Sequence, residues 1–234
     1  MKTGILGGAF NPPHIAHLLL ADYASEALNL DKVLFIPTKN PPHKKIDGNW
    51  DAELRYLLIQ IASFSISPFE LKKSINRFQI PNDGREKNPT ILSFLLIYEN
   101  LYPYYHNPHW EVSNIEINNA SHEYSYTVNT IRKLKVLNPN DEFTIIIGCD
   151  QAEVLNTWKE LENIKKMAAF AVGNRREKKL SNILEKFPFI TTFEFPQIDF
   201  SSTMVRERIR NHQLYQHLVP GIIGIFITLL PELF

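Results

Sequence analysis

The sequence predicts an α/β protein built on a mostly parallel sheet with helices on both faces. Short apolar runs alternate along the chain with longer segments whose apolar residues recur at helical spacing, and this alternation is typical of parallel sheets. Ligands bind to such sheets beyond the carboxyl ends of the strands. We therefore expect the chemistry just after Leu6, Ile36 and Ile147, and just after the strand that precedes Ser201.

The length and the flanks of each run predict the individual elements. Compact or alternating apolar runs predict strands at residues 3–6, 33–37, 110–117, 143–147, 168–172 and 191–195. Apolar residues spaced for one helical face predict helices at residues 14–28, 53–62, 91–100, 125–137, 203–210 and 220–230. The sequence contains no internal repeat and no long linker.

The 234 residues are predicted to form a single domain with an inserted subregion at about residues 64–109. The insert is first rich in Pro, Asn and Lys and then aromatic. No motif falls inside it, so we expect it to be peripheral to the chemistry. The aromatic cluster of Tyr102, Tyr104, Tyr105 and Trp110 needs burial. We expect this cluster to pack on the flank of the domain, although a second subunit, and with it a homo-oligomer, is left open.

Charge and composition argue against several classes of protein. Lys plus Arg equals Asp plus Glu, at 25 each, whereas a dedicated nucleic-acid binder usually carries a basic excess. Cys149 is the single cysteine, so no internal disulfide forms and nothing points to secretion. The most apolar stretch, residues 218–230, is interrupted by Pro220 and two glycines and is too short to span a bilayer. We expect a cytoplasmic protein without a membrane partner.

The first motif runs from Gly7 to His17 and reads GGAFNPPHIAH. Two glycines after a strand let the backbone approach a phosphate, because no Cβ intervenes, and the N-terminus of the following helix attracts anions. His14 and His17 are three residues apart, so on one helical turn they share a face and can donate hydrogen bonds to phosphate oxygens. The competing interpretation is a glycine turn followed by two incidental histidines, and the spacing disfavours it.

The second motif is the run FSSTMVR at residues 200–206. Ser and Thr at a helix start cap the first turn and present hydroxyl groups together with free N–H groups. Arg206 lies one turn further on, and its planar guanidinium suits triphosphate oxygens. Taken alone, this run is an ordinary helix cap followed by an exposed arginine.

Together the two motifs resemble the GxFxPxHxxH and ISSTxIR signatures of the nucleotidyltransferase superfamily, whose members transfer a nucleotidyl group from a nucleoside triphosphate. The resemblance implies a Rossmann-like, doubly wound fold and direct in-line attack on the α-phosphate. It also implies that the two histidines bind the triphosphate and that the second motif clasps its β- and γ-phosphates. The implied ATP-binding residues are Gly7, Gly8, Ala9, Phe10, His14, His17, Gly148, Asp150, Ser201, Ser202, Thr203 and Arg206.

Three smaller features resemble the nicotinate-nucleotide adenylyltransferases within that superfamily. The loop NPPHK at residues 40–44 provides a point charge for phosphate, and the segment YSYT at residues 124–127 opens a helix whose N–H groups suit a nicotinate carboxylate. In the run IGCD at residues 147–150, Gly148 and Asp150 are implied to face the ribose of the nucleotide. The tryptophan that follows is implied to stack on the pyridine ring. The implied mononucleotide-binding residues are Lys44, Ser125, Tyr126, Thr127 and Trp158. Ala9 and Asn11 depart from the Thr and Asp that are usual in bacterial members.

The implied reaction joins ATP and nicotinate mononucleotide into nicotinate adenine dinucleotide and pyrophosphate, a step of NAD biosynthesis. The nucleophile is an already ionised phosphate oxygen, so no general base is needed. Catalysis is then expected from His14, His17, Lys44 and Arg206, with a Mg²⁺ held by ATP and water and by no protein ligand. Two alternatives stay open. One is a different acceptor, such as nicotinamide mononucleotide or a phosphopantetheine-like group, and the other is a non-catalytic nucleotide-binding regulator.

Overall fold

The computed structural model describes the chain except for residues 43–45, 47–49, 76, 78–88, 119–123, 175–176, 197 and 232–234, and it leaves out the side chains of residues 174 and 177–180. The chain divides into two compact units. Unit 1 comprises Met1–Ala9, Ala16–Lys45 and Ser113–Asp199, and unit 2 comprises Phe10–Ile15, Ile46–Val112 and Phe200–Phe234. The single domain with an insert at residues 64–109 stays a prediction.

Unit 1 is built on a parallel sheet with the strand order β2-β1-β4-β5-β6. Gly4 of β1 lies opposite Val33 of β2 on one side and opposite Thr144 of β4 on the other. The chain therefore adds β2 on one side of β1 and the later strands on the other side, and the strand order reverses direction between β1 and β4. This reversal is the point at which open parallel sheets bind their ligands. The strands are β1 (Lys2–Gly8), β2 (Lys32–Pro37), β4 (Glu142–Gly148), β5 (Ala168–Asn174) and β6 (Ile190–Glu194). They confirm the predicted parallel α/β fold.

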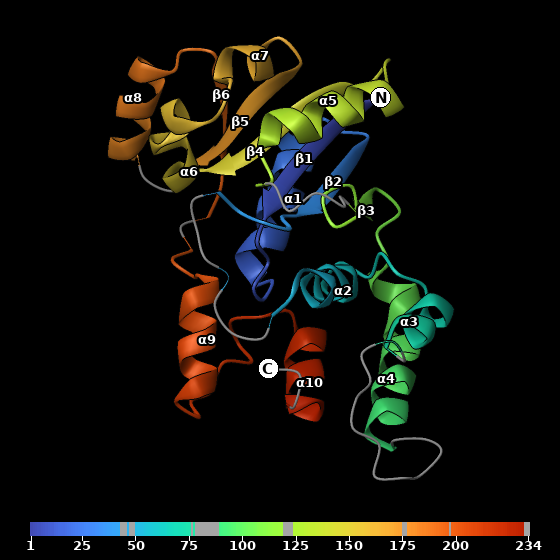
Figure 1. Cartoon of the computed structure of the whole chain (residues 1–234). Coiled ribbons are helices and arrows are strands. Elements are labelled where there is room, and N and C mark those ends of the chain that lie inside the picture. The colour runs from blue at the N-terminus through green and yellow to red at the C-terminus, as the bar shows by residue number, and fades with distance from the viewer. Residues whose placement is uncertain are drawn as a thin grey trace. The chain divides into compact units, whose positions relative to one another are not determined.

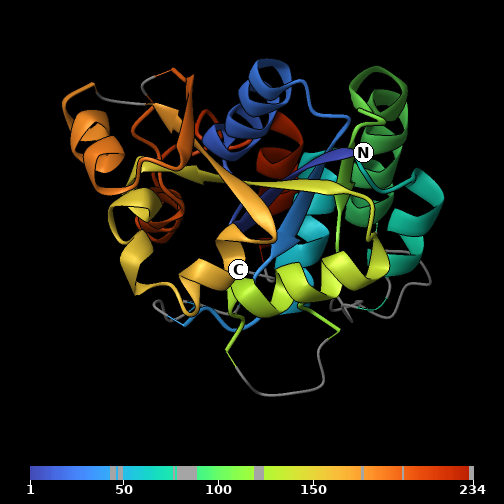
Figure 2. The same ribbon diagram turned by 90° about the horizontal axis from the view of Figure 1, so that it is seen from above.

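Two helices cover opposite faces of this sheet, α1 (Ile15–Leu28) and α5 (Thr127–Leu137) (Figure 2). On the α1 face, Leu20 lies so close to Gly173 that a Cβ at the glycine would be 2.6 Å from Leu20 Cδ1. On the α5 face, Ile131 is fully buried in a core cluster with residues of the strands. The central parts of β2 and β4 are apolar and buried, because both faces of the sheet are covered there.

Four short elements of unit 1 were absent from the sequence prediction. They are α6 (Cys149–Glu153), the 3₁₀ helix η2 (Leu155–Thr157), α7 (Leu161–Lys165) and α8 (Glu177–Lys186). Three of them are five residues long or shorter, so they present too few turns for a helical period to be recognised. The first three lie between β4 and β5 and carry one wall of the candidate site.

Unit 2 is mainly helical (Figure 1). Its elements are α2 (Ala52–Ala62), α3 (Pro68–Ile75), α4 (Pro89–Tyr105), β3 (Trp110–Val112), α9 (Ser202–Arg210) and α10 (Gly221–Leu229). The Asp51 side chain caps α2 by accepting a hydrogen bond from Leu54 N at 2.7 Å. Helices α4 and α10 meet through Phe94 and Phe226, whose ring centroids are 4.9 Å apart. Among the described residues, no helix combines the length and the apolar character that crossing a membrane requires.

The aromatic residues of the insert are partly packed within unit 2. Tyr98 stacks on Phe64 at 5.0 Å between ring centroids, and its hydroxyl donates to Ile66 O at 2.8 Å. Tyr105 stacks on the same phenylalanine ring at 5.3 Å. Tyr104 is 84% exposed and Tyr105 remains 62% exposed despite its stacking contact, so the expectation that the whole cluster is buried was wrong for these two residues.

Two predicted element boundaries were also wrong. The strand predicted at residues 110–117 ends at Val112, because Ser113 Oγ accepts a hydrogen bond from Ile115 N at 3.3 Å and turns the chain out of the extended conformation. The helix predicted at residues 91–100 extends over Pro89–Tyr105. Local side-chain bonding and tertiary packing, which apolar periodicity does not report, determine both boundaries.

Candidate active site

The glycines of the first motif lie at the carboxyl end of β1, beside the reversal in strand order. Gly8 ends the strand, and its carbonyl accepts a hydrogen bond from Thr38 N at 2.9 Å. Gly7, Gly8 and Ala9 line a cavity of about 210 Å³ whose lining residues all belong to unit 1. A Cβ built on Gly7 would meet no atom within 4 Å, so open space lies beside the backbone where the motif predicts a phosphate.

The two predicted histidines lie at the start of α1. The helix begins at Ile15, so His14 immediately precedes it and His17 lies in its first turn. His14 is buried and His17 is half-buried. Residues three apart share a face only where both lie inside a helix, and His14 lies just before α1. The orientation of both side chains toward a triphosphate therefore stays a prediction.

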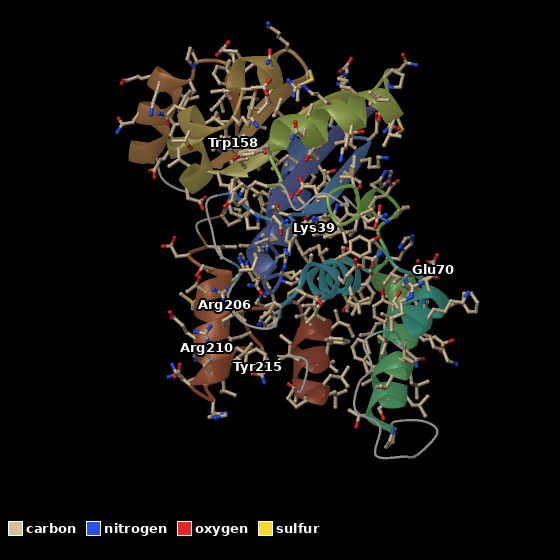
Figure 3. All side chains as sticks on the ribbon, viewed as in Figure 1. Lys39, Glu70, Trp158, Arg206, Arg210 and Tyr215 are labelled. Atoms are coloured by element: carbon tan, nitrogen blue, oxygen red, sulfur yellow. The ribbon has the colours of Figure 1, made fainter. Side chains whose placement is uncertain are left out.

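The second motif is joined directly to the first one within unit 2. Arg206 is 5% exposed, and its Nη1 donates to Asn11 O at 2.7 Å while its Nη2 donates to Thr203 Oγ1 at 3.2 Å. Ser202 Oγ donates to Pro12 O at 2.9 Å. Residues 195 positions apart in the sequence therefore hold each other in place. Arg206 lies at the middle of α9 (Figure 3), and its expected contact with phosphate stays a prediction.

The other residues of the second motif lie at the amino end of α9. Ser201 is its N-cap, and its hydroxyl accepts a hydrogen bond from Met204 N at 3.2 Å. Ser201 and Thr203 are exposed, and Phe10 of the first motif is fully buried with a φ of 47°. A left-handed backbone is uncommon for a residue other than glycine, and here it belongs to the turn that follows β1.

The amino end of α5 forms one wall of the cavity through Ser125, Tyr126 and Thr127. Tyr126 is the N-cap residue, and its side chain makes no capping hydrogen bond. Ser125 is tied to the loop after β2, because its N–H donates to Asn40 O at 2.8 Å and its Oγ accepts from Asn40 N at 3.2 Å. A helix amino end with no side-chain cap attracts negative charge. The structure therefore brings together the three residues that the YSYT segment predicted.

The wall contributed by the segment between β4 and β5 carries Trp158 and Lys159, which both line the cavity. Trp158 follows η2, is half-buried and packs edge-on against Phe170 at 6.1 Å between ring centroids (Figure 3). The Lys159 Nζ lies 4.4 Å from the centroid of the Tyr126 ring. This lysine was missed by the sequence analysis, although its position directly after the predicted tryptophan was a signal.

Glu116 is a second lining residue that the sequence analysis missed. Its Oε1 accepts a hydrogen bond from Thr130 Oγ1 at 2.6 Å. Burial raises the pKa of Glu116, and hydrogen bonds from Thr130, from the Ser125 side chain and from the Lys39 backbone lower it in part. The carboxyl group thus links α5 to the loop after β2. A lone Glu between two isoleucines carries no sequence signal for such a role, since the segment is not a motif.

Gly148 and Asp150 lie at the carboxyl end of β4. Gly148 is the N-cap of α6, and the exposed Asp150 lies in the first turn of that helix. Asp150 Oδ1 would be 2.6 Å from a Cβ at Gly148, so the carboxylate packs directly against the glycine. Neither residue is among those that line the cavity, and their predicted contact with the ATP ribose stays a prediction.

Lys44 lies outside the described residues, so its predicted role toward phosphate stays a prediction. Within the described part of the chain, no cluster of three or more His, Cys, Asp or Glu side chains is arranged to hold a metal ion.

Comparison with known proteins gives a consistent result. Residues 5–208 match the cytidylyltransferase-like family. A probable nicotinate-nucleotide adenylyltransferase of Trichlorobacter lovleyi is 32% identical, over 97% of each chain, and one of Oceanobacillus iheyensis is 31% identical over 94% of this chain and 90% of the relative. A solved structure of Plasmodium falciparum nicotinic acid mononucleotide adenylyltransferase complexed with NaAD has the same fold, with a TM-score of 0.65 and 19% identity over 97% of this chain and 96% of that one.

The family match spans the glycine loop, the cavity walls and the first turns of α9. The relatives agree with the chain over nearly its whole length, and the glycine loop lies at a strand end, where the fold expects its ligands. The chain therefore belongs to the cytidylyltransferase-like family, and within it to the nicotinate-nucleotide adenylyltransferases.

Proposed function

We propose that this protein transfers AMP from ATP to nicotinate mononucleotide, giving nicotinate adenine dinucleotide and pyrophosphate. The observation that carries the proposal is the cavity at the switch point of the sheet. One of its walls is the amino end of α5, which has no side-chain cap, and another carries the half-buried indole of Trp158. A carboxylate suits the helix end, and an aromatic ring suits the indole face. A pyridine carboxylic acid combines both features.

The proposed chemistry needs no acid–base residue. A phosphate oxygen of the mononucleotide attacks the α-phosphorus of ATP, the new P–O bond forms, and the bond between the α-phosphorus and the bridging oxygen breaks, so that pyrophosphate leaves with that oxygen and its electron pair. The protein's part is to hold both substrates in line and to neutralise the developing charge. His14, His17, Lys44 and Arg206 are the residues proposed for that task. Mg²⁺ bound to the triphosphate would supply further charge neutralisation.

The test is an initial-rate assay that follows pyrophosphate release and identifies the dinucleotide by chromatography. ATP is supplied with nicotinate mononucleotide, nicotinamide mononucleotide or 4′-phosphopantetheine in separate reactions. We expect nicotinate adenine dinucleotide as the main product, and His17→Ala should lower kcat by roughly 10²–10³-fold without changing the circular dichroism spectrum. Higher catalytic efficiency with another acceptor would reassign the substrate. Binding of ATP without pyrophosphate release from any mixture would support the regulator instead.

A further inference from the structure

We propose that Lys159 sets the acceptor specificity of the cavity by pairing with the ring carboxylate of nicotinate mononucleotide. The inference rests on the proposed function, and it deepens that function by naming the side chain that distinguishes a pyridine acid from the corresponding amide. The amino end of α5 contributes backbone dipoles from its own wall of the cavity. Lys159, on the wall formed by the segment between β4 and β5, contributes a full charge.

The position of Lys159 is the first argument. The residue directly follows Trp158, and both line the same cavity as the Ser125–Thr127 segment. The Lys159 Nζ lies 4.4 Å from the Tyr126 ring centroid, and Tyr126 is the N-cap of α5. The ammonium group is therefore held over the residue from which the helix starts, and a ring that stacks near Trp158 has both the helix end and the lysine beside it.

The second argument is that the Lys159 ammonium forms no ion pair with a described carboxylate. The carboxylate of the neighbouring Glu160 is hydrogen-bonded to Arg132 and Asn163, and these bonds, with a smaller contribution from the charge of Lys159, lower its pKa. Across the described part of the chain, no carboxylate oxygen forms an ion pair with the Lys159 ammonium. Glu116, the acidic residue of the cavity lining, is hydrogen-bonded to Thr130. An ammonium group that forms no close ion pair and lies at a cavity wall favours an anionic ligand.

The third argument is the charge of the two possible acceptors. The pyridine nitrogen of a mononucleotide is bonded to ribose, so the ring carries a positive charge in both molecules. The carboxylate of the acid neutralises that charge and attracts Lys159. The amide does neither, so the lysine and the ring repel each other.

The test compares Lys159→Met with a matched control, Lys165→Met. The control removes a lysine that pairs with Glu162 at 2.9 Å and lies outside the cavity lining. For each variant and for Lys159→Arg, kcat/KM is measured with nicotinate and with nicotinamide mononucleotide, and Kd for each mononucleotide is measured by calorimetry without ATP. We expect Lys159→Met to lose about tenfold in kcat/KM and in affinity for the acid, as is typical for one charge-assisted contact that is partly exposed. Values for the amide should be unchanged or improved.

The controls make the outcomes distinct. Lys165→Met should match the wild type, and Lys159→Arg should retain most of the preference for the acid. Equal losses with both mononucleotides would overturn the proposal, since they would place Lys159 on the shared phosphate or in a structural role. An unchanged acid-to-amide ratio, or a wild type that prefers the amide, would also overturn it. A wild type that shows the Kd difference but no turnover would refute the proposed transferase activity and leave the assignment of Lys159 standing.

Discussion

Replacing Gly148 by alanine should impair catalysis while sparing stability, and the same replacement at Gly173 should do the opposite. The two glycines are register partners on the neighbouring strands β4 and β5, so they form a matched pair. A Cβ at Gly148 would lie 2.6 Å from Asp150 Oδ1. A Cβ at Gly173 would lie 2.6 Å from Leu20 Cδ1, 3.2 Å from Phe193 Cζ and 3.3 Å from the Phe195 Cβ.

The neighbours that each new methyl group meets determine the two magnitudes. At Gly148 the neighbour is the end of an exposed side chain, so Asp150 moves by roughly 0.8 Å at a stability cost below about 0.5 kcal/mol. If Asp150 contacts the ATP ribose, as the IGCD run implies, a displacement of that order costs about 10–100-fold in kcat/KM for ATP. At Gly173 the neighbours are buried residues of the core, and overpacking of that kind costs about 1–3 kcal/mol.

Two measurements on each variant check this reasoning. Urea unfolding followed by circular dichroism gives the free energy of unfolding, and initial rates of dinucleotide formation at varied ATP give kcat/KM. Gly173→Ala should shift the unfolding midpoint to lower urea. Gly148→Ala should unfold like the wild type but require more ATP. A Gly148→Ala enzyme with wild-type kinetics would refute the role of Asp150, and a Gly173→Ala protein of unchanged stability would refute the packing argument.

Two further predictions concern Glu116 and Tyr98. Burial raises the pKa of Glu116 in the folded protein, so its contribution to the free energy of unfolding is present below the unfolded-state pKa and is lost as pH rises through the folded-state pKa. Glu116→Gln removes this loss, so urea unfolding should show the variant gaining stability relative to the wild type as the pH rises from the unfolded-state pKa through the folded-state pKa. A difference in stability that is independent of pH would contradict this. Tyr98→Phe removes the hydroxyl that donates to the buried Ile66 O at 2.8 Å. The variant should lower the free energy of unfolding by about 1–2 kcal/mol and leave kcat unchanged. A loss below about 0.5 kcal/mol would count against that hydrogen bond.

The candidate site was predictable to the extent that its chemistry is local in the sequence. A glycine turn after a strand and a helix that opens with Ser or Thr are contiguous features, and the structure places Gly7, Gly8 and the Ser125–Thr127 segment around one cavity. Trp158 lines the same cavity. The tryptophan follows the end of β4 by ten residues, and short helical elements form the segment between them. The roles of His14, His17, Lys44 and Arg206 toward ATP stay predictions, since they depend on a bound triphosphate.

Element type could be read from apolar periodicity, since a buried parallel strand and a helix with one buried face differ in the spacing of their apolar residues. Periodicity could not give the ends of β3 and α4, because these depend on a hydroxyl of Ser113 and on the stacking of Tyr105 on Phe64. The aromatic insert shows the same limit. Composition indicated that its tyrosines need partners, but the stacking of Tyr98 and Tyr105 on Phe64 depends on the path of the chain.

The linear order of residues was sufficient to specify the parallel α/β architecture, the glycine loop and the family, because strand spacing, glycine turns and helix starts are properties of short contiguous segments. Tertiary structure alone decided that Arg206 bonds to Asn11 O across 195 positions and that Glu116 and Lys159 line the same cavity. Burial and hydrogen-bond partners of this kind arise only when distant segments meet. The residues that tune a site, unlike those that define its motif, therefore become visible only in the folded chain.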